Sequence, residues 1–318
     1  GRQNRRQPNM ATPRGHIVDD EAVGTYHCIS RCVRKAMLCG EGLEHRRAWI
    51  ETRIADLQGA MAIDLTAWHV MANHMHLVVT TRPDIVREWS DREVAERHLR
   101  MCPGRWRRRR KGIPVDQPPT SDEIAEITGS PDRIKTLRRR LSCLSWFMAK
   151  LKEHVARLSN LEDGCTGHFW EGRFRSVKVL DRPSLLATST YVDLNSVRAG
   201  VVDRPEDSSH GSISERVAML MGLPRRTRIR LDHAPHEDEA TYLSHVDAWG
   251  RVVLGGKRAT PESLPPILKR LKISKRRWIE LLRANWGRFR GTAIGTPESK
   301  RREVERRGGR WLIDPLAG

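Results

Sequence analysis

The stretch that organises this chain is Ala62-Ile63-Asp64-Leu65-Thr66-Ala67-Trp68-His69-Val70-Met71-Ala72-Asn73-His74-Met75-His76-Leu77-Val78-Val79-Thr80-Thr81. Strand-forming residues fill both halves, and Asn73 lies between them in a short turn. The pattern predicts a hairpin of two strands, Ala62–Met71 and His74–Thr81. Because side chains on a strand alternate between its two faces, His74 and His76 point to the same side of the sheet.

A second stretch, far along the chain, supplies a phenol and an amide. Tyr191 and Asn195 are four residues apart, in a segment that Asp181 and Pro183 open as a helix and Gly200 ends. Residues at positions i and i+4 share one face of a helix. If this helix packs on the histidine strand, two neutral imidazoles and an amide oxygen could hold a divalent metal ion beside the phenol. Such groups can cleave a phosphodiester through a tyrosyl-phosphate ester.

Each of these residues also has a structural interpretation. A surface His-x-His is usually structural, and a helical tyrosine is most often a core aromatic. The chain has three tyrosines. Tyr191 shares its helix face with Asn195 and Arg198, which favours a chemical role. Tyr26 is expected to pack in a strand, and Tyr242 to lie outside the core.

The remaining patterns indicate an α+β fold. Apolar residues at spacings of three and four predict helices, and runs of β-branched and aromatic residues predict strands. The further elements expected are the strand Thr25–Val33, the helix Glu44–Ala60, the helix Asp91–Met101, one long helix over Ile134–Leu158 and the strand His168–Val179. The simplest arrangement of this order is a ferredoxin-like antiparallel sheet with helices packed on it.

The charge of the chain points to a polyanionic partner. Lysine and arginine number 58 and aspartate and glutamate 39, which gives a formal net charge of +19. The basic residues cluster, and clustering favours nucleic acid over a merely solvated basic surface. The residues assigned to nucleic acid are Arg107, Arg108, Arg109 and Arg110 in one run, Arg173, Arg175 and Lys178 along one face of a strand, and Arg198. Since each can neutralise a phosphate, binding should weaken with salt.

Several classes of protein are disfavoured. No stretch approaches the roughly 20 apolar residues of a membrane span, so no membrane partner is expected, and no segment has the layout of a secretory signal. The six cysteines form no Cys-x-x-Cys pair, which argues against a zinc site and for a reduced, cytoplasmic protein. The expected location is the bacterial cytoplasm, in association with the nucleoid.

Composition divides the chain into three parts. They are a basic N-terminal tail (1–21), a core (22–204) with a basic insertion or linker (82–133), and a mainly helical C-terminal region (205–318). In the last part, Leu264–Trp286 resembles a helix-turn-helix whose positive second helix would suit a DNA groove. A small helical bundle with a basic face is the alternative. Residues from Gly291 onward are expected to be loose.

Four stretches carry a family likeness when they are taken together and in order. They are Tyr26-His27-Cys28-Ile29-Ser30-Arg31, Val70-Met71-Ala72-Asn73-His74-Met75-His76-Leu77, Gly167-His168-Phe169-Trp170-Glu171-Gly172-Arg173-Phe174-Arg175-Ser176 and Tyr191-Val192-Asp193-Leu194-Asn195-Ser196-Val197-Arg198-Ala199-Gly200. The core that contains them resembles the HUH-type single-tyrosine transposases, and within these the REP-associated tyrosine transposases.

The resemblance implies a ferredoxin-like HUH endonuclease core that cuts single-stranded DNA near palindromic hairpins through a 5′-phosphotyrosine intermediate. By resemblance Tyr191 is the nucleophile, His74 and His76 are metal ligands, and Asn195 is a third ligand, with Mg²⁺ or Mn²⁺ as the ion. The family usually has proline where this chain has Ser196, and the loss of a proline within a helical pattern should straighten the helix. Asp193 is expected to be a solvent-facing acid of this helix, with a water-mediated role near the metal as the alternative.

Three functions remain open at this point. The first is a metal-dependent single-stranded DNA endonuclease and strand transferase, acting as a monomer or a homodimer. The second is a catalytically silent regulator of the same fold that binds hairpins of DNA or RNA. The third is a replication initiator or relaxase with the same chemistry. The sequence shows no glycine-rich phosphate-binding loop with lysine, which counts against a helicase partner domain and so against the third.

Overall fold

The computed structural model describes residues 17–102, 104–110, 112–114, 116–231, 242–246, 274, 276 and 292–307, with the backbone alone for 105–107. Most of the basic tail lies outside these residues. The helix-turn-helix expected over 264–286 also lies outside them, apart from residues 274 and 276.

A five-stranded sheet forms the centre of the protein, in the order β2-β3-β1-β4-β5. The four strands expected from the sequence are β1 (Gly24–Arg31), β2 (Ile63–Val70), β3 (His74–Thr81) and β4 (Arg175–Val179), and they pair antiparallel. Helix α1 (His45–Ala60) connects β1 to β2, and α7 (Leu144–Glu162) lies between β3 and β4 in the chain. This order, with β3 and β1 between β2 and β4, is ferredoxin-like, so the predicted fold is confirmed.

The register of the sheet gathers four histidines on one face. In the β1–β3 pairing Ile29 lies opposite His76, and in the β2–β3 pairing His69 lies opposite His76. Directly opposed residues share a face, and so do residues two apart on one strand. His27 and His74 therefore point the same way as His69 and His76.

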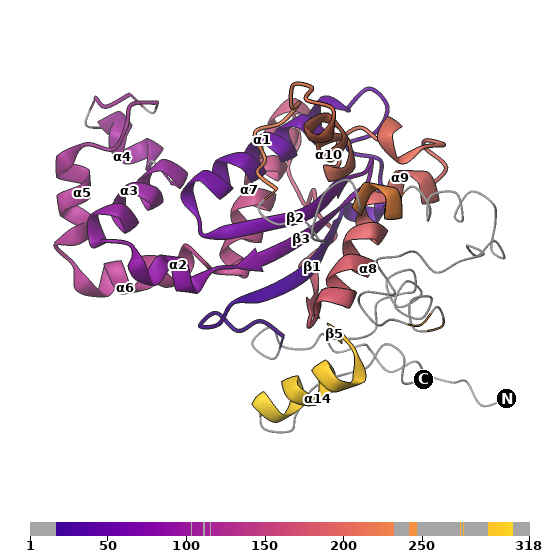
Figure 1. Ribbon diagram of the computed structural model, residues 1–318. Coiled ribbons are helices and arrows are strands. Elements are labelled where there is room, and N and C mark those ends of the chain that lie inside the picture. The colour runs from indigo at the N-terminus through magenta and orange to yellow at the C-terminus, as the bar shows by residue number, and fades with distance from the viewer. Residues whose placement is uncertain are drawn as a thin grey trace, which may run out of the picture.

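Different helices cover the two faces of the sheet (Figure 1). Helices α1 and α7 contact each other and pack on the face opposite the histidines, where strand residues such as Trp68 and Leu77 complete the main hydrophobic core. Helix α8 (Arg182–Asp193) packs on the histidine face, where Tyr191 joins a smaller apolar cluster with Ala67 and Val78. The fold thus places the tyrosine helix directly over the histidine strands.

The insertion between β3 and α7 is a helical lobe beside the sheet (Figure 1). Its helices are α2 (Pro83–Glu88), α3 (Asp91–Met101), α4 (Arg105–Arg110), α5 (Ser121–Thr128) and α6 (Pro131–Arg140). The single helix predicted over Ile134–Leu158 is wrong, because α6 ends at Arg140 and α7 begins at Leu144. Apolar spacing continues through the break since both helices bury into one core, while the Leu141 carbonyl accepts a 2.8 Å hydrogen bond from the Ala62 N–H.

Several of the described segments beyond residue 205 return to the core, among them the following two. One runs along the edge of β2, where the Val70 N–H donates to the His210 carbonyl at 2.8 Å, and continues into α10 (Ser212–Leu220). The other forms β5 (Ala293–Ile294), parallel to β4, and α14 (Pro297–Arg306). The expectation that the chain is loose from Gly291 onward is therefore wrong for 292–307. Within the described ranges, no helix has the length and apolar character to cross a membrane.

Candidate functional site

Two of the four histidines are oriented by neighbours that leave one ring nitrogen of each available. His74 Nδ1 lies 2.6 Å from Asn73 Oδ1, and His76 Nδ1 lies 2.9 Å from His27 Nε2. An amide oxygen only accepts, so His74 Nδ1 carries the proton and Nε2 keeps its lone pair. Burial lowers the pKa of His74 to about 4 and holds that of His76 well below its usual range. Both rings are therefore neutral near pH 7, the form that binds metal ions.

The tyrosine helix brings its phenol against these rings. The centre of the Tyr191 ring lies 5.6 Å from that of His76 and 5.9 Å from that of His27, both edge-on. The guanidinium carbon of Arg198 lies 4.4 Å from the centre of the Tyr191 ring, a cation–π contact. Tyr191 is 8% exposed. A helical tyrosine, an arginine and two early histidines thus meet at one place.

Asn195 does not continue the helix of Tyr191. Helix α8 ends at Asp193, Leu194 has φ −90° and ψ 8°, and α9 (Asn195–Arg198) begins after it. The expectation that Ser196 straightens this segment is wrong, since the helix breaks here without a proline. Ser196 Oγ instead donates to Ser208 Oγ at 2.8 Å, in a buried contact with the chain beyond residue 205.

His74 and His76 are the side chains on this face that could bind a divalent ion. Among the described residues no group of three or more His, Cys, Asp or Glu side chains is arranged to hold a metal, so such an ion would depend on His74, His76 and an amide. Asn195 is 6% exposed, and its Nδ2 has no hydrogen-bond partner within the described part of the chain. A buried amide with an unfilled polar position fits a ligand role, because the amide can turn its oxygen to a cation. Two imidazoles and an amide suit Mn²⁺ better than Mg²⁺.

The sequence predicts His27 as part of a strand and gives no assignment of this residue to the site. It is fully buried, it shares the hydrogen bond with His76, and burial lowers its pKa to about 3. The available signal is strand parity, because His27 and Ile29 are two residues apart and share a face, and Ile29 pairs with His76. His69 also lies on this face, and burial lowers its pKa to about 3.

Two expectations about acids and tyrosines are wrong. Asp193 does not face solvent but is 0% exposed, and Tyr242 is not outside the core but is fully buried. The Tyr242 hydroxyl donates to Asp193 Oδ2 at 2.6 Å. Helical periodicity placed Asp193 on the outside because the sequence gives no sign of which later segments cover that side of α8.

Two of the basic residues assigned to nucleic acid are buried and already paired. Arg108 is 1% exposed and donates to Glu123, at 2.7 and 2.9 Å, and to the Pro114 and Pro118 carbonyls. Lys178 forms a buried ion pair of 2.8 Å with Glu303. Lys178 also lies opposite Tyr26, whereas Arg175 lies opposite Ile29. The two therefore face opposite sides of β4, because Lys178 is three positions after Arg175 and side chains alternate along a strand.

Four of the other basic candidates are exposed to solvent, and Arg198 is half-buried over the Tyr191 ring. Arg173 and Arg175 are exposed, and Arg175 lies on the histidine face of the sheet. Arg109 and Arg110 are exposed on α4, while the side chain of Arg107 lies outside the described residues. A phosphate backbone that approaches the tyrosine can therefore meet Arg175 on the same face.

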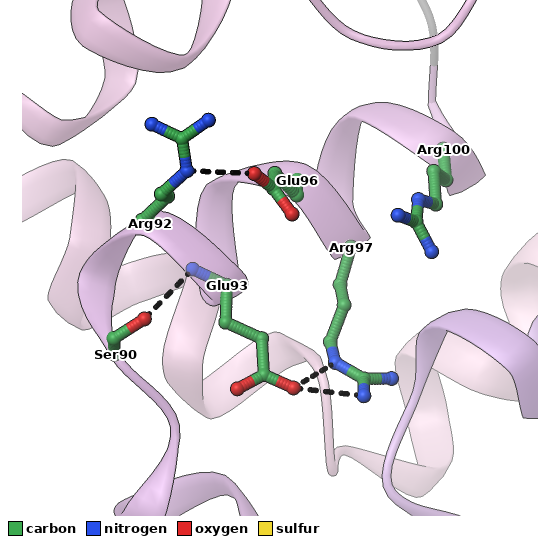
Figure 2. Close-up of a pocket in the computed structure, with 6 residues that line it drawn as sticks. All are labelled: Ser90, Arg92, Glu93, Glu96, Arg97 and Arg100. Carbon is green, nitrogen blue, oxygen red and sulfur yellow. Dashed lines mark hydrogen bonds and ion pairs between the residues drawn. The ribbon is translucent and has the colours of Figure 1, made fainter.

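A depression of about 300 Å³ lies on the insertion lobe, formed by side chains of α3 and Ser90 (Figure 2). Its charges pair within the helix, Arg92 with Glu96 at 2.9 Å and Arg97 with Glu93 at 2.8 Å. Paired exposed charges of this kind stabilise the helix surface only weakly. The chemical groups lie on the histidine face instead.

The strand order and the histidine face under a tyrosine helix define an α+β protein with a ferredoxin-like core. A solved structure of a REP-associated tyrosine transposase bound to a REP hairpin is similar to this chain, over 71% of this chain and 92% of that one, with 15% sequence identity and a TM-score of 0.38. The sequence motifs resemble the same group of proteins. No protein-family model and no curated protein matches the chain. The fold assignment rests on the strand order and register of this chain itself.

Proposed function

We propose that the protein is a metal-dependent single-stranded DNA endonuclease and strand transferase that acts near palindromic hairpins. The observation that carries the proposal is the contact of Tyr191 with His76, at 5.6 Å between ring centres. A phenol beside neutral imidazoles and under a guanidinium is suited to attack a phosphodiester. The net charge of +19 supports a nucleic-acid substrate.

In the proposed reaction Tyr191 Oη attacks the scissile phosphorus. A bond forms between Oη and phosphorus, the bond from phosphorus to the 3′ oxygen breaks, and that oxygen leaves as a 3′-hydroxyl after it takes a proton. The phenol gives up its own proton as it attacks. The ester keeps a 5′-phosphotyrosine, so a 3′-hydroxyl of a second DNA end can reverse the step and rejoin the strand.

Each residue of the site has a separate role in the proposed reaction. Arg198, which lies over the Tyr191 ring, stabilises negative charge on the phenol oxygen and on the phosphate. His74 Nε2, His76 Nε2 and the Asn195 amide would hold a Mn²⁺ or Mg²⁺ ion, which supplies polarisation of the scissile phosphate. Arg173 and Arg175 contact the backbone of the incoming strand.

The test is covalent capture. The protein is incubated with Mn²⁺ and a pool of 3′-labelled single-stranded oligonucleotides, each with a hairpin of randomised stem and flanks, and run on a denaturing gel. Because the tyrosine keeps the 5′-phosphate of the downstream fragment, the 3′ label should migrate with the protein. Tyr191→Phe should abolish the adduct, and chelation of the metal should prevent it.

Tyr26→Phe is the matched control, since it removes one phenol hydroxyl from the opposite face of the sheet and should leave the adduct in place. Tight hairpin binding by the wild-type protein without any adduct or cleavage would reject the nuclease and favour the regulator of the same fold. An adduct that survives Tyr191→Phe would reject Tyr191 as the nucleophile.

A further inference from the structure

The end of the tyrosine helix carries a buried acid that the proposed chemistry does not use. Asp193 stands two residues after Tyr191 and is 0% exposed. Burial of a carboxylate is costly unless hydrogen bonds and an opposite charge compensate for it. Asp193 has such partners, and the described ones come from segments beyond residue 205.

Three side chains surround this carboxylate, and with it they form what we call the Asp193 cluster. Ser212 Oγ donates to Asp193 Oδ1, the Tyr242 hydroxyl donates to Oδ2 at 2.6 Å, and Arg216 Nε lies 3.9 Å from Oδ2. Arg216 is fully buried and stacks on the Tyr242 ring, at 5.0 Å from its centre. Charge, hydrogen bonds and packing therefore converge on one helix end.

The cluster is also fixed to the sheet that carries the histidines. A β-bulge leaves Thr66 without a partner in β3, and the carbonyl of Thr66 accepts a hydrogen bond from Arg216 Nη2. Ser212 Oγ accepts from the Trp68 N–H at 2.9 Å and lies 3.1 Å from the Trp68 carbonyl oxygen. Thr66 and Trp68 flank Ala67, which packs with Tyr191 in the smaller apolar cluster. The Asp193 cluster therefore ties α8 to β2 beside the site.

The other end of the tyrosine helix is held in a comparable way. Asp181 caps α8 by accepting from the Ser184 N–H at 2.9 Å. Its second oxygen accepts from the Thr296 N–H at 2.6 Å and from Ser299 Oγ, at the start of α14. Although burial raises the pKa of Asp181, the hydrogen bonds from Ser184 and Ser299 leave it below the usual value, so the cap stays charged.

We propose that the chain beyond residue 205 holds the tyrosine helix at both ends, and that Asp193 is the positioning residue that fixes Tyr191 against His27 and His76. The catalytic consequence of this proposal rests on the proposed function. Its structural consequence rests on the contacts alone. The C-terminal segments then belong to the catalytic core instead of forming a separate module. A loosened cluster should leave hairpin binding intact and slow the step that needs the phenol in place.

The structural consequence can be measured without any DNA. The sequence holds three tyrosines, so the protein labelled with 3-fluorotyrosine gives three ¹⁹F resonances, which Tyr191→Phe and Tyr242→Phe assign. Asp193→Asn should shift or broaden the Tyr191 resonance and leave that of Tyr26, on the opposite face, unchanged. An unchanged Tyr26 resonance also shows that the variant is folded.

The catalytic consequence is measured on the same variants. Asp193→Asn should lower the rate of adduct formation roughly ten- to a hundredfold, with hairpin affinity unchanged. Tyr242→Phe removes one hydroxyl from the cluster and should act in the same direction with a smaller effect, whereas Tyr26→Phe should not. If Asp193→Asn does not fold, Tyr242→Phe provides the test, through the Tyr191 fluorine resonance and through the rate of adduct formation at unchanged hairpin affinity.

A Tyr191 resonance that is unshifted and equally sharp in the folded variants would overturn the positioning proposal, whatever their activity. If the wild-type protein forms no adduct but the Tyr191 resonance responds as expected, the proposed function fails and the positioning of the helix stands. The two proposals are thus separable by experiment.

Discussion

Among individual side chains, His27 and His76 depend most directly on each other, because the position of the proton on one ring determines its position on the other. Both are neutral near pH 7, because burial lowers the pKa of each, so their 2.9 Å hydrogen bond needs one N–H and one lone pair. If His76 Nδ1 donates to His27 Nε2, then His76 Nε2 keeps the lone pair that a metal ion needs. An imidazole fixed in this way by an outer partner is a better ligand than a free one.

Substitution of His27 tests this arrangement through metal affinity. His27→Leu removes the acceptor and should weaken Mn²⁺ binding about 10- to 100-fold, measured by calorimetry on the protein without DNA. His27→Gln keeps an acceptor oxygen for His76 and should retain most of the affinity. Equal losses in the two variants would show that the volume of the ring matters and the hydrogen bond does not.

Among the helices, α14 shows how a late segment is held to the core by charge. Glu303 accepts from Lys178 Nζ at 2.8 Å and from Arg306 at 3.0 and 3.1 Å. Although burial raises the pKa of this carboxyl, the hydrogen bonds from Arg306 and Lys178 lower it to about 2. A charged Glu303 therefore stabilises the folded protein relative to the unfolded chain.

The sign of the pH effect follows from that direction. Because the folded pKa lies below the unfolded value near 4.5, the stabilisation is complete above pH 4.5 and is lost as the pH falls toward 2. Urea unfolding at pH 7 and at pH 3 should show a loss of stability for the wild-type protein. Glu303→Gln should be less stable at pH 7 and lose less between the two pH values. A parallel loss in both proteins would assign the acid sensitivity to other groups.

For the protein as a whole, local sequence patterns predict the secondary structure better than they predict long-range contacts. The turn at Asn73 and the alternation after it predict β3 with its observed bounds, because a two-residue period fixes which side chains share a face. The sequence does not show the break between α6 and α7, since the apolar period continues through Leu141. Strand parity alone would have separated Lys178 from Arg175.

The residues of the candidate site also fall into those that local sequence patterns predict and those that they do not. His74 and Tyr191 were found because a strand and a helix each carry a recognisable local pattern. The burial of Asp193 could not be found locally, because its partners Ser212 and Tyr242 lie 19 and 49 residues further along the chain. Contacts of that range depend on how the chain after residue 205 returns to the core, and composition alone does not contain this information.

The excess of positive charge makes a last prediction about DNA affinity and salt. Each phosphate contact on a single strand adds about 0.7 to the slope of log affinity against log salt concentration. Arg173 and Arg175 are exposed, and Arg175 lies on the face of the sheet that Tyr191 covers, so the double variant Arg173→Gln/Arg175→Gln should lower the slope by about 1.4 and weaken binding of all hairpin oligonucleotides alike.

The matched control removes the same charge from places where it is already paired. Arg92 pairs with Glu96 at 2.9 Å and Arg228 with Asp56 at 3.0 Å, both on the surface. Arg92→Gln/Arg228→Gln should leave the salt slope unchanged, because those guanidiniums are neutralised within the protein. Fluorescence anisotropy with a labelled hairpin from 50 to 300 mM salt, roughly the range over which such contacts weaken, separates the cases. Equal slopes for both double variants would mean that overall charge, and not a path of arginines toward Tyr191, draws the strand to the protein.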